Sequence, residues 1–202
     1  MIGQADIETV SEAIRAAETR TAGEIFCVIT QSSGSYRLVP LAWAALAALV
    51  LPLPLIYVTT WPALIIYVGQ LALFVVTAAV LSLPGVRYYV VPRRVMHQHA
   101  HDEAMRQFLA HGLHLTEART GVLIFASVAE RYAEIIADSG IHSKVGTAAW
   151  QEAVATMVAA IKADRPAQGF IAAIEKCGAV LAQHFPPGAI NRNELPNALV
   201  VM

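Results

Sequence analysis

The chain has 202 residues, of which 56% are hydrophobic and only 14% are charged, and its formal net charge is −1 at pH 7. A chain of this length ordinarily forms one domain, and globular proteins carry about a quarter charged residues. The near-zero net charge gives no electrostatic argument for nucleic acid as a partner, so none is expected. Cys27 and Cys177 lie far apart and form no CxxC pair. This excludes a zinc ribbon and a thioredoxin-like motif, and free thiols are expected.

Residues 1–36 predict a helix followed by a strand. In ADIETVSEAIRAAETRT, apolar side chains recur at helical spacing, and EIFCVITQ (residues 24–31) is rich in β-branched and aromatic residues. A lone helix and strand cannot bury enough apolar surface to fold alone. We therefore expect residues 1–36 to be the first part of an α/β domain that a later part of the chain completes.

Residues 37–87 predict a transmembrane hairpin. No Asp, Glu, Lys or Arg lies between Arg37 and Arg87, and the stretches 41–60 and 62–83 each approach the roughly 20 residues that a spanning helix needs. TTWP between them suits a tight turn, aromatic residues flank both ends as interfacial anchors, and two prolines predict a kink in the first span. The alternative is a buried hairpin of a globular core, which turns and polar residues would normally interrupt.

The arginines beside the hairpin predict its orientation. Arg37 precedes the two spans and Arg87, Arg93 and Arg94 follow them, whereas the connecting turn carries no positive charge. By the positive-inside rule, both termini are expected in the cytoplasm, with two passes through the inner (cytoplasmic) membrane. The beginning of the chain is acidic and lacks an early apolar run, so no cleavable signal is expected. The lipid bilayer is therefore an expected partner.

Residues 88–202 predict the remainder of the domain. Their patterns indicate, in order, a helix over about 92–111, strands at 120–127 and 132–138, and helices over about 146–162 and 166–184. The two strands are joined by few residues and should form an antiparallel hairpin. The predicted fold class is α/β, a small layered sheet covered by helices, with the two-helix hairpin inserted after the first strand. The apolar C-terminal tail is expected to pack back on the domain.

Several separate blocks of sequence occur in an order that is typical of one family. They are AAETRTAGEIFCVITQSSGSY, TEARTGVLIFASVAERYAEIIADSGI, Trp150, GFIAAIEKCGAVLAQHFP and NELPN. These blocks resemble the TPM domain family, and the arrangement is similar to the bacterial branch in which two transmembrane helices interrupt the domain. The resemblance implies a small α/β sandwich. It also implies weak acid phosphatase activity and divalent-cation binding, which different members show, or assistance to membrane protein complexes, which others show. Calcium and magnesium are the candidate ions for such a site.

The resemblance further implies which residues of this chain occupy the motif positions of the family. These family-motif positions stand at the ends of the predicted strands and near the C-terminus: Thr21, Gly23, Glu24, Arg119, Thr120, Gly121, Glu130, Arg131, Asp138, Gly140, Asn193, Glu194, Leu195 and Pro196.

Four residues form the candidate cation or phosphate site: Asp138, Glu130, Arg131 and Glu24. Asp138 ends a predicted strand, so its carboxylate is expected to emerge at the sheet edge where α/β sites usually lie. Hard divalent ions need several oxygen ligands, and phosphoryl transfer needs such an ion or an arginine clamp. The alternative is structural: Asp138 caps the following turn, and Glu130 and Arg131 form a solvated hairpin tip.

The segment HQHAHD (residues 97–102) raises the question of a second metal site. On a helix, His97 and His101 fall within an apolar stripe that includes Ala100 and Ala104, while His99 falls on the opposite side. Only His97 and His101 could bind one metal ion, with a third ligand from elsewhere. The alternative is a pair of partly buried or interfacial histidines at the start of a helix beside the membrane.

Absent motifs narrow the chemistry. The sequence has no Cys-x5-Arg phosphate cradle, Walker A motif, GxGxxG or GxSxG, so a hydrolase would have to use a metal or carboxylates. Two functions stay open. One is a membrane-tethered, cytosol-facing accessory or quality-control factor for membrane protein complexes, with another membrane protein as partner. The other is a weak, divalent-cation-dependent phosphohydrolase, whose catalytic residues the sequence does not identify.

Overall fold

The computed structural model describes residues 2–142, 144–146, 148–187 and 193–202. The chain divides into two compact units. The first joins Met1–Ser33 to His97–Met202, and the second is the intervening segment Gly34–Met96. The inserted segment therefore interrupts a unit that both ends of the chain build together.

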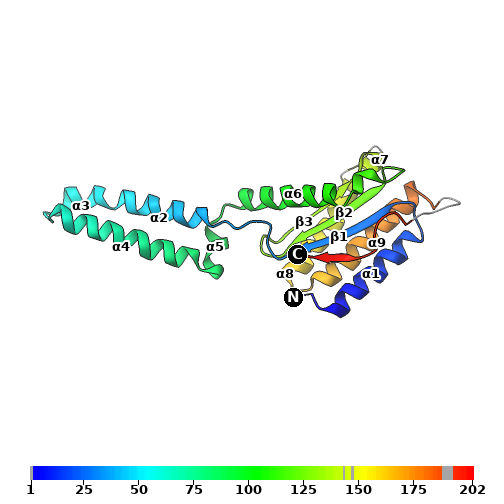
Figure 1. Cartoon of the computed structure of the whole chain (residues 1–202), viewed down its shortest axis with the longest axis horizontal. Helices are drawn as coiled ribbons and strands as arrows, with labels where there is room; N and C mark the ends of the chain where they lie inside the picture. The colour runs from blue at the N-terminus through cyan, green and yellow to red at the C-terminus, as the bar shows by residue number, and fades with distance from the viewer. Residues whose placement is uncertain (1, 143, 147, 188–192) are drawn as a thin grey trace. The chain divides into compact units, whose positions relative to one another are not determined.

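A four-stranded sheet forms the centre of the first unit (Figure 1). Its strands are β1 (Glu24–Thr30), β2 (Gly121–Ser127), β3 (Tyr132–Ala137) and β4 (Leu199–Val201), in the order β3-β2-β1-β4. Strand β1 is parallel to β2 and β4, whereas β2 and β3 form the predicted antiparallel hairpin. Every residue of β1 and β2 is buried, which agrees with their continuous apolar runs.

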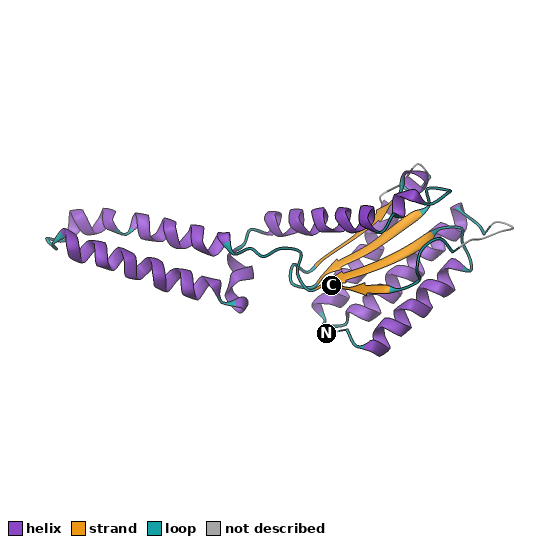
Figure 2. Ribbon diagram, in the orientation of Figure 1, coloured by secondary structure: helices purple, strands orange, loops and turns teal. Residues whose placement is uncertain are grey.

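Helices cover both faces of this sheet (Figure 2). The helices α1 (Gln4–Glu18), α8 (Ala148–Lys162) and α9 (Pro166–His184) pack on one face, and α6 (Arg93–Ala110) packs on the other. Because side chains alternate along a strand, Ile25 and Cys27 of β1 enter the first core while Phe26 and Val28 enter the second. The predicted α/β fold, a small sheet covered by helices, is confirmed.

The C-terminal tail completes the sheet. Its end forms β4, where the Met202 N–H donates to the Ile29 carbonyl over 2.9 Å and the Gln31 N–H donates to the Met202 carbonyl over 3.0 Å. The expectation that the tail packs back is confirmed for this part, while residues 188–192 of the tail lie outside the described residues. The short elements η1 (Leu113–Leu115) and α7 (Ser139–His142) connect the larger ones.

The second unit is helical. Its helices are α2 (Leu38–Val50), α3 (Pro52–Val58), α4 (Ala63–Ser82) and α5 (Pro84–Val90). The break between α2 and α3 falls at Leu51, directly before Pro52, because proline lacks the N–H that would continue the ladder. The segments Leu38–Val58 and Ala63–Ser82 are each long and apolar enough to span a membrane, with mean hydropathies of 2.2 and 2.4.

Candidate functional site

The four residues of the predicted cation or phosphate site lie at opposite ends of the sheet. Glu24 begins β1 opposite Gly121, and the Asp138 N–H donates to the Gly121 carbonyl, so Glu24 and Asp138 flank the same end of β2. Glu130 and Arg131 follow Ser127, at the other end of that strand. The structure therefore does not bring the four residues together.

Asp138 lies at the amino ends of the parallel strands, which corrects the expectation for this residue. Because β3 runs antiparallel to β2, the end of β3 meets the beginnings of β1 and β2, whereas α/β sites usually lie at the carboxyl ends. Asp138 is only 7% exposed. Its Oδ1 accepts hydrogen bonds from the Ser139 N–H at 2.6 Å and the Ser139 hydroxyl at 3.1 Å, as a turn cap would.

The second carboxylate oxygen of Asp138, Oδ2, is a buried polar atom without a hydrogen-bond partner among the residues that the structure describes. Nη1 of Arg119 lies 4.0 Å away from it. A calcium or magnesium ion needs about six oxygen ligands, several of them usually carboxylates. No group of three or more His, Cys, Asp or Glu side chains in the described part of the chain is placed to hold a metal ion. The side chains around Asp138 therefore do not fit a resident divalent ion.

Glu130 is buried rather than solvated. It is 5% exposed, and its carboxylate accepts hydrogen bonds from the Ser33 N–H at 3.0 Å, the Ser32 hydroxyl at 3.1 Å and the Ser127 hydroxyl. The interpretation of Glu130 as a solvated hairpin tip is wrong, because this carboxylate ties the turn after β2 to the segment after β1. Arg131 is exposed and adopts a positive φ of 50°, as the tight connection to β3 requires.

Three carboxylates gather at the beginning of β1. Oε1 of Glu18, at the end of α1, accepts the Ile25 N–H at 2.9 Å, and Oε2 of Glu24 accepts the Leu195 N–H at 3.2 Å. Oε2 of Glu194 accepts the Glu117 N–H at 3.0 Å. Each carboxylate thus fastens one chain segment to another, and the two carboxylates from the family motif, Glu24 and Glu194, serve here to hold the C-terminal segment.

Burial gives two of these carboxyl groups unusual acidities. Desolvation raises the pKa of Glu18 to about 7, and the neighbouring Glu24 charge adds to this, while the hydrogen bond from Ile25 opposes it. Burial also raises the pKa of Glu24, against the hydrogen bonds that it accepts from the Leu195 and Glu194 backbone. Sequence reasoning missed Glu18, although its place four residues after Ile14 puts it on the buried stripe of α1.

Three further family-motif positions, Thr21, Thr120 and Gly121, make close contacts with backbone carbonyls at the same end of the sheet. Thr21 donates its hydroxyl to the Phe185 carbonyl at 2.8 Å, and Thr120 donates to the Ala22 carbonyl at 3.1 Å. The space for a Cβ at Gly121 is taken by the Leu113 carbonyl. Gly23 abuts Leu181, and Asn193 lies on the surface.

The two histidines of the predicted pair have different partners in the structure. The buried stripe of α6 is Met96, Ala100, Ala104 and Phe108, and both histidines lie beside it rather than within it. His101 Nδ1 pairs with Glu134 at 2.9 Å, whereas the His97 ring packs 5.1 Å from the Tyr132 ring. The prediction that both histidines fall within the buried stripe is therefore wrong. Met96 and Ala100 occupy the stripe, and His97 and His101, each one position further along the helix, lie to its side.

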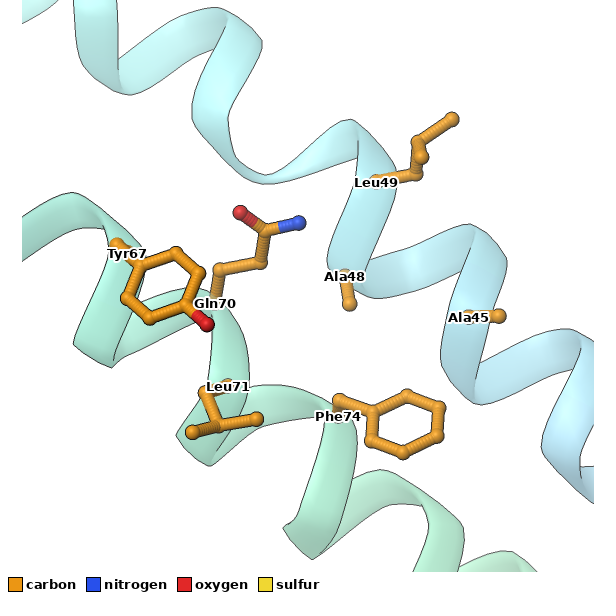
Figure 3. Close-up of a pocket in the computed structure, with 7 residues that line it drawn as sticks. All are labelled: Ala45, Ala48, Leu49, Tyr67, Gln70, Leu71 and Phe74. Atoms are coloured by element: carbon orange, nitrogen blue, oxygen red, sulfur yellow. The ribbon is translucent and has the colours of Figure 1, made fainter.

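The second, helical unit contains a groove of its own. It has a volume of about 250 Å³ and opens between α2 and α4 (Figure 3). The residues that line it are Ala45, Ala48, Leu49, Tyr67, Gln70, Leu71 and Phe74. Figure 3 shows the Gln70 amide projecting from α4 towards α2. Sequence reasoning missed this amide, although a glutamine in an otherwise apolar segment is itself a signal.

Comparison with known proteins identifies the sheet-bearing part of the chain. Residues 84–180 match the family model for the TPM domain. This part of the chain is therefore similar to the TPM domain family. The matched residues include α6, β2, β3, α8 and most of α9. Strand β1 lies before the matched residues in the sequence, but it pairs with β2 in the same sheet.

A solved structure has the same fold as this chain. The NMR structure of the BA42 protein from the psychrophilic bacterium Bizionia argentinensis superposes with a TM-score of 0.63 at 20% sequence identity. The alignment covers 100% of this chain and 96% of that chain. No curated protein matches the chain.

Proposed function

We propose that this chain is a membrane-tethered TPM domain protein whose α/β unit faces the cytosol and acts as an accessory or quality-control factor for membrane protein complexes. The observation that supports tethering to a membrane is the exposure of the two apolar helices of the hairpin. In the most apolar 18-residue windows of Leu38–Val58 and Ala63–Ser82, only 11% and 0% of the residues are buried. Helices of such hydropathy in a soluble core would be covered, and lipid is the medium that covers them here.

The orientation follows from charge. The four arginines of the inserted segment all stand where the chain enters and leaves the hairpin, and the connecting turn has none. Under the positive-inside rule this charge distribution supports a cytoplasmic location of both termini, and with them of the α/β unit, at the inner membrane.

The carboxylates of the α/β unit support an accessory role. Glu18, Glu24, Glu130 and Glu194 each accept a backbone N–H from another segment, so they act as structural links. Chemistry that needs several convergent carboxylates would require these groups to leave their present partners, at a cost of about 1–3 kcal/mol for each buried donor left unpaired.

Gln70 supports a membrane protein as the partner. A glutamine amide within a spanning helix is costly to leave unpaired, and neighbouring helices commonly satisfy it. The part of the chain that the structure describes shows no hydrogen bond to the Gln70 side chain. A polar group on a partner helix at the same depth would supply one.

Cross-linking in native membranes tests this function. We expect the full-length protein to capture a membrane protein, and Gln70→Leu to reduce the recovery of that protein about fivefold, as loss of one interhelical hydrogen bond of about 1 kcal/mol predicts. Thr77→Val on the same helix is the matched control and should leave recovery unchanged. Equal recovery with Gln70→Leu and wild type would contradict the role of Gln70, and absence of any membrane protein partner would contradict the accessory function.

The alternative is a weak phosphohydrolase, which the orphan Oδ2 of Asp138 beside Arg119 favours. An arginine clamp would draw a phosphoryl group to this end of the sheet. Turnover of a chromogenic phosphate ester by the full-length protein, with and without calcium or magnesium, decides this. Activity that Asp138→Asn abolishes would favour the hydrolase, and equal rates for the two proteins would exclude Asp138 from it.

A further inference from the structure

We infer that the base of the hairpin is a binding site for the phosphate headgroups of anionic lipids, built from Arg37, Arg87, Arg93 and Arg94. This site, called the arginine collar here, rests on the proposed membrane tether. It concerns which lipid the tether selects, which the tether alone does not specify.

The arginine collar contains all the Asp, Glu, Lys and Arg side chains of the inserted segment, and all of them are positively charged. The segment Gly34–Met96 contains these four arginines and no Asp, Glu or Lys. The rest of the chain carries ten basic and fifteen acidic side chains, so its overall charge does not favour an anionic surface. The collar is therefore the part of the chain whose net charge favours anionic lipid.

Packing holds the two sides of the collar together. Tyr36 and Tyr88, which adjoin Arg37 and Arg87 in sequence, contact each other edge to face with ring centroids 6.0 Å apart. The indole Nε1 of Trp43 donates to the Val90 carbonyl at 3.2 Å. These contacts join the beginning of α2 to α5, so Arg37 and Arg87 stand at one end of the hairpin although fifty positions separate them in the sequence.

The collar lacks anionic partners of its own. Within the described residues no carboxylate lies within ion-pair distance of any of its four arginines, and the Arg87 guanidinium lies over the Tyr88 ring, 5.4 Å from its centroid. The Nε of Arg87 is buried and has no hydrogen-bond partner. A buried guanidinium N–H without an acceptor indicates a missing ligand, and a phosphate oxygen is the acceptor that arginine binds best, often through two N–H groups.

Apolar groups beside the arginines point to lipid rather than to free phosphate. Leu38 is 78% exposed, Leu83 is 55% exposed and the Tyr89 ring is 88% exposed. Tyrosine at this level is typical of the membrane interface, with its ring among the acyl chains and its hydroxyl at the headgroups. A lipid supplies both the phosphate for the arginines and the chains for these side chains, whereas free phosphate supplies only the first.

Thermal unfolding of the full-length protein in a non-ionic detergent tests the site with short-chain lipids. We expect phosphatidylglycerol to raise the Tm at a concentration at least about tenfold lower than phosphatidylcholine of the same chain length, since each basic group near an anionic lipid adds about fivefold in affinity. This difference should shrink at 1 M NaCl because salt screens the collar. Inorganic phosphate, the soluble arm of the experiment, should produce no shift at the same concentrations.

The variant that tests the collar replaces its three exposed arginines. The triple substitution Arg37→Gln, Arg93→Gln and Arg94→Gln should abolish the preference for phosphatidylglycerol, and Arg87→Lys, which keeps the charge but loses the two-pronged contact, should weaken it. The matched control removes three basic groups of the α/β unit: Arg15→Gln, Arg20→Gln and Lys162→Gln. It should leave the preference intact, and all variants should first show the wild-type Tm without lipid to within a few degrees.

Three results would overturn the inference: equal effects of the two lipids, equal loss in the control triple, or an equal shift with inorganic phosphate. Membrane fractionation separates this failure from failure of the tether. A protein that resists alkaline extraction from membranes but has no lipid preference contradicts the collar alone, whereas a protein that is soluble without detergent contradicts the proposed function.

Discussion

Gly140 shows why a family-motif position has to be glycine. A Cβ at this position would lie 2.5 Å from the Arg119 carbonyl oxygen and 2.8 Å from the Ala118 carbonyl oxygen, both of them backbone atoms that cannot rotate away. We expect Gly140→Ala to destabilise the protein by about 2 kcal/mol, as overpacking of a closed site does. Thermal unfolding measures this, with Gly146→Ala as the control, because nothing lies within 4 Å of a Cβ there. Equal melting of the two variants would show that the contact is not tight.

Glu18 makes the stability of the α/β unit depend on pH. Its pKa is about 7 in the folded protein against 4.5 for an ordinary glutamate, so the folded state holds the proton more tightly. The stabilisation is complete below pH 4.5, and it is lost as the pH rises through 7. Glu18→Gln keeps an oxygen for the Ile25 N–H and removes the charge.

We therefore expect Glu18→Gln to gain about 1–3 kcal/mol of stability relative to wild type between pH 4.5 and pH 8. Unfolding curves across this range provide the measurement. Glu12→Gln, an exposed position on the same helix, should follow wild type at every pH. A constant offset between Glu18→Gln and wild type would mean that Glu18 ionises normally.

The site was predicted from the sequence only in part. The sequence located Glu24, Thr21, Gly121 and Gly140 at strand ends, because motif resemblance marks positions without needing their contacts. It could not place Asp138 at the correct end of the sheet, since that depends on β3 reversing direction. It could not show that Glu130 is buried either, because the segment that covers this carboxylate, Ser32 and Ser33, is 97 residues away in the chain.

At the scale of elements, long periodic segments were predicted to within one or two residues. The helix expected over 92–111 is Arg93–Ala110, and the one expected over 166–184 is Pro166–His184. The short elements α7, η1 and β4 were not predicted, because three or four residues are too few to show a period. Strand β4 exists through its pairing with β1, a tertiary contact that local sequence does not encode.

The pairing of β1 predicts what happens when the hairpin is removed. Tyr36 and Tyr88 are in contact, so a short flexible linker can replace residues 38–87 and still join residue 37 to residue 88 without moving either of them. We expect this shortened chain to be soluble and to unfold cooperatively, as measured by urea titration, because β1 still fills its place between β2 and β4.

The matched control is residues 88–202 alone. Without β1, this fragment exposes the edge of β2 and leaves β4 without its partner, so we expect it to aggregate. A monomeric, stable fragment 88–202 would show that the N-terminal residues are not part of the same folding unit.

At the scale of the whole molecule, the chain combines an α/β unit closed by internal hydrogen bonds with an inserted helical segment that exposes its apolar surface. The α/β unit can bury its core by itself, whereas the hairpin cannot cover its own surface in water. The proposed role of the protein therefore requires lipid around the hairpin and the rest of the chain on the cytoplasmic side of the membrane.

Topology reporters test most directly whether the hairpin spans the membrane with both termini in the cytoplasm. Fused in turn before residue 1, after residue 60 and after residue 202, they should read cytoplasm, outside and cytoplasm, because the positive-inside rule favours the end of the hairpin that carries the arginines on the cytoplasmic side. A reporter after residue 202 that reads outside would contradict both the orientation and the cytosol-facing function.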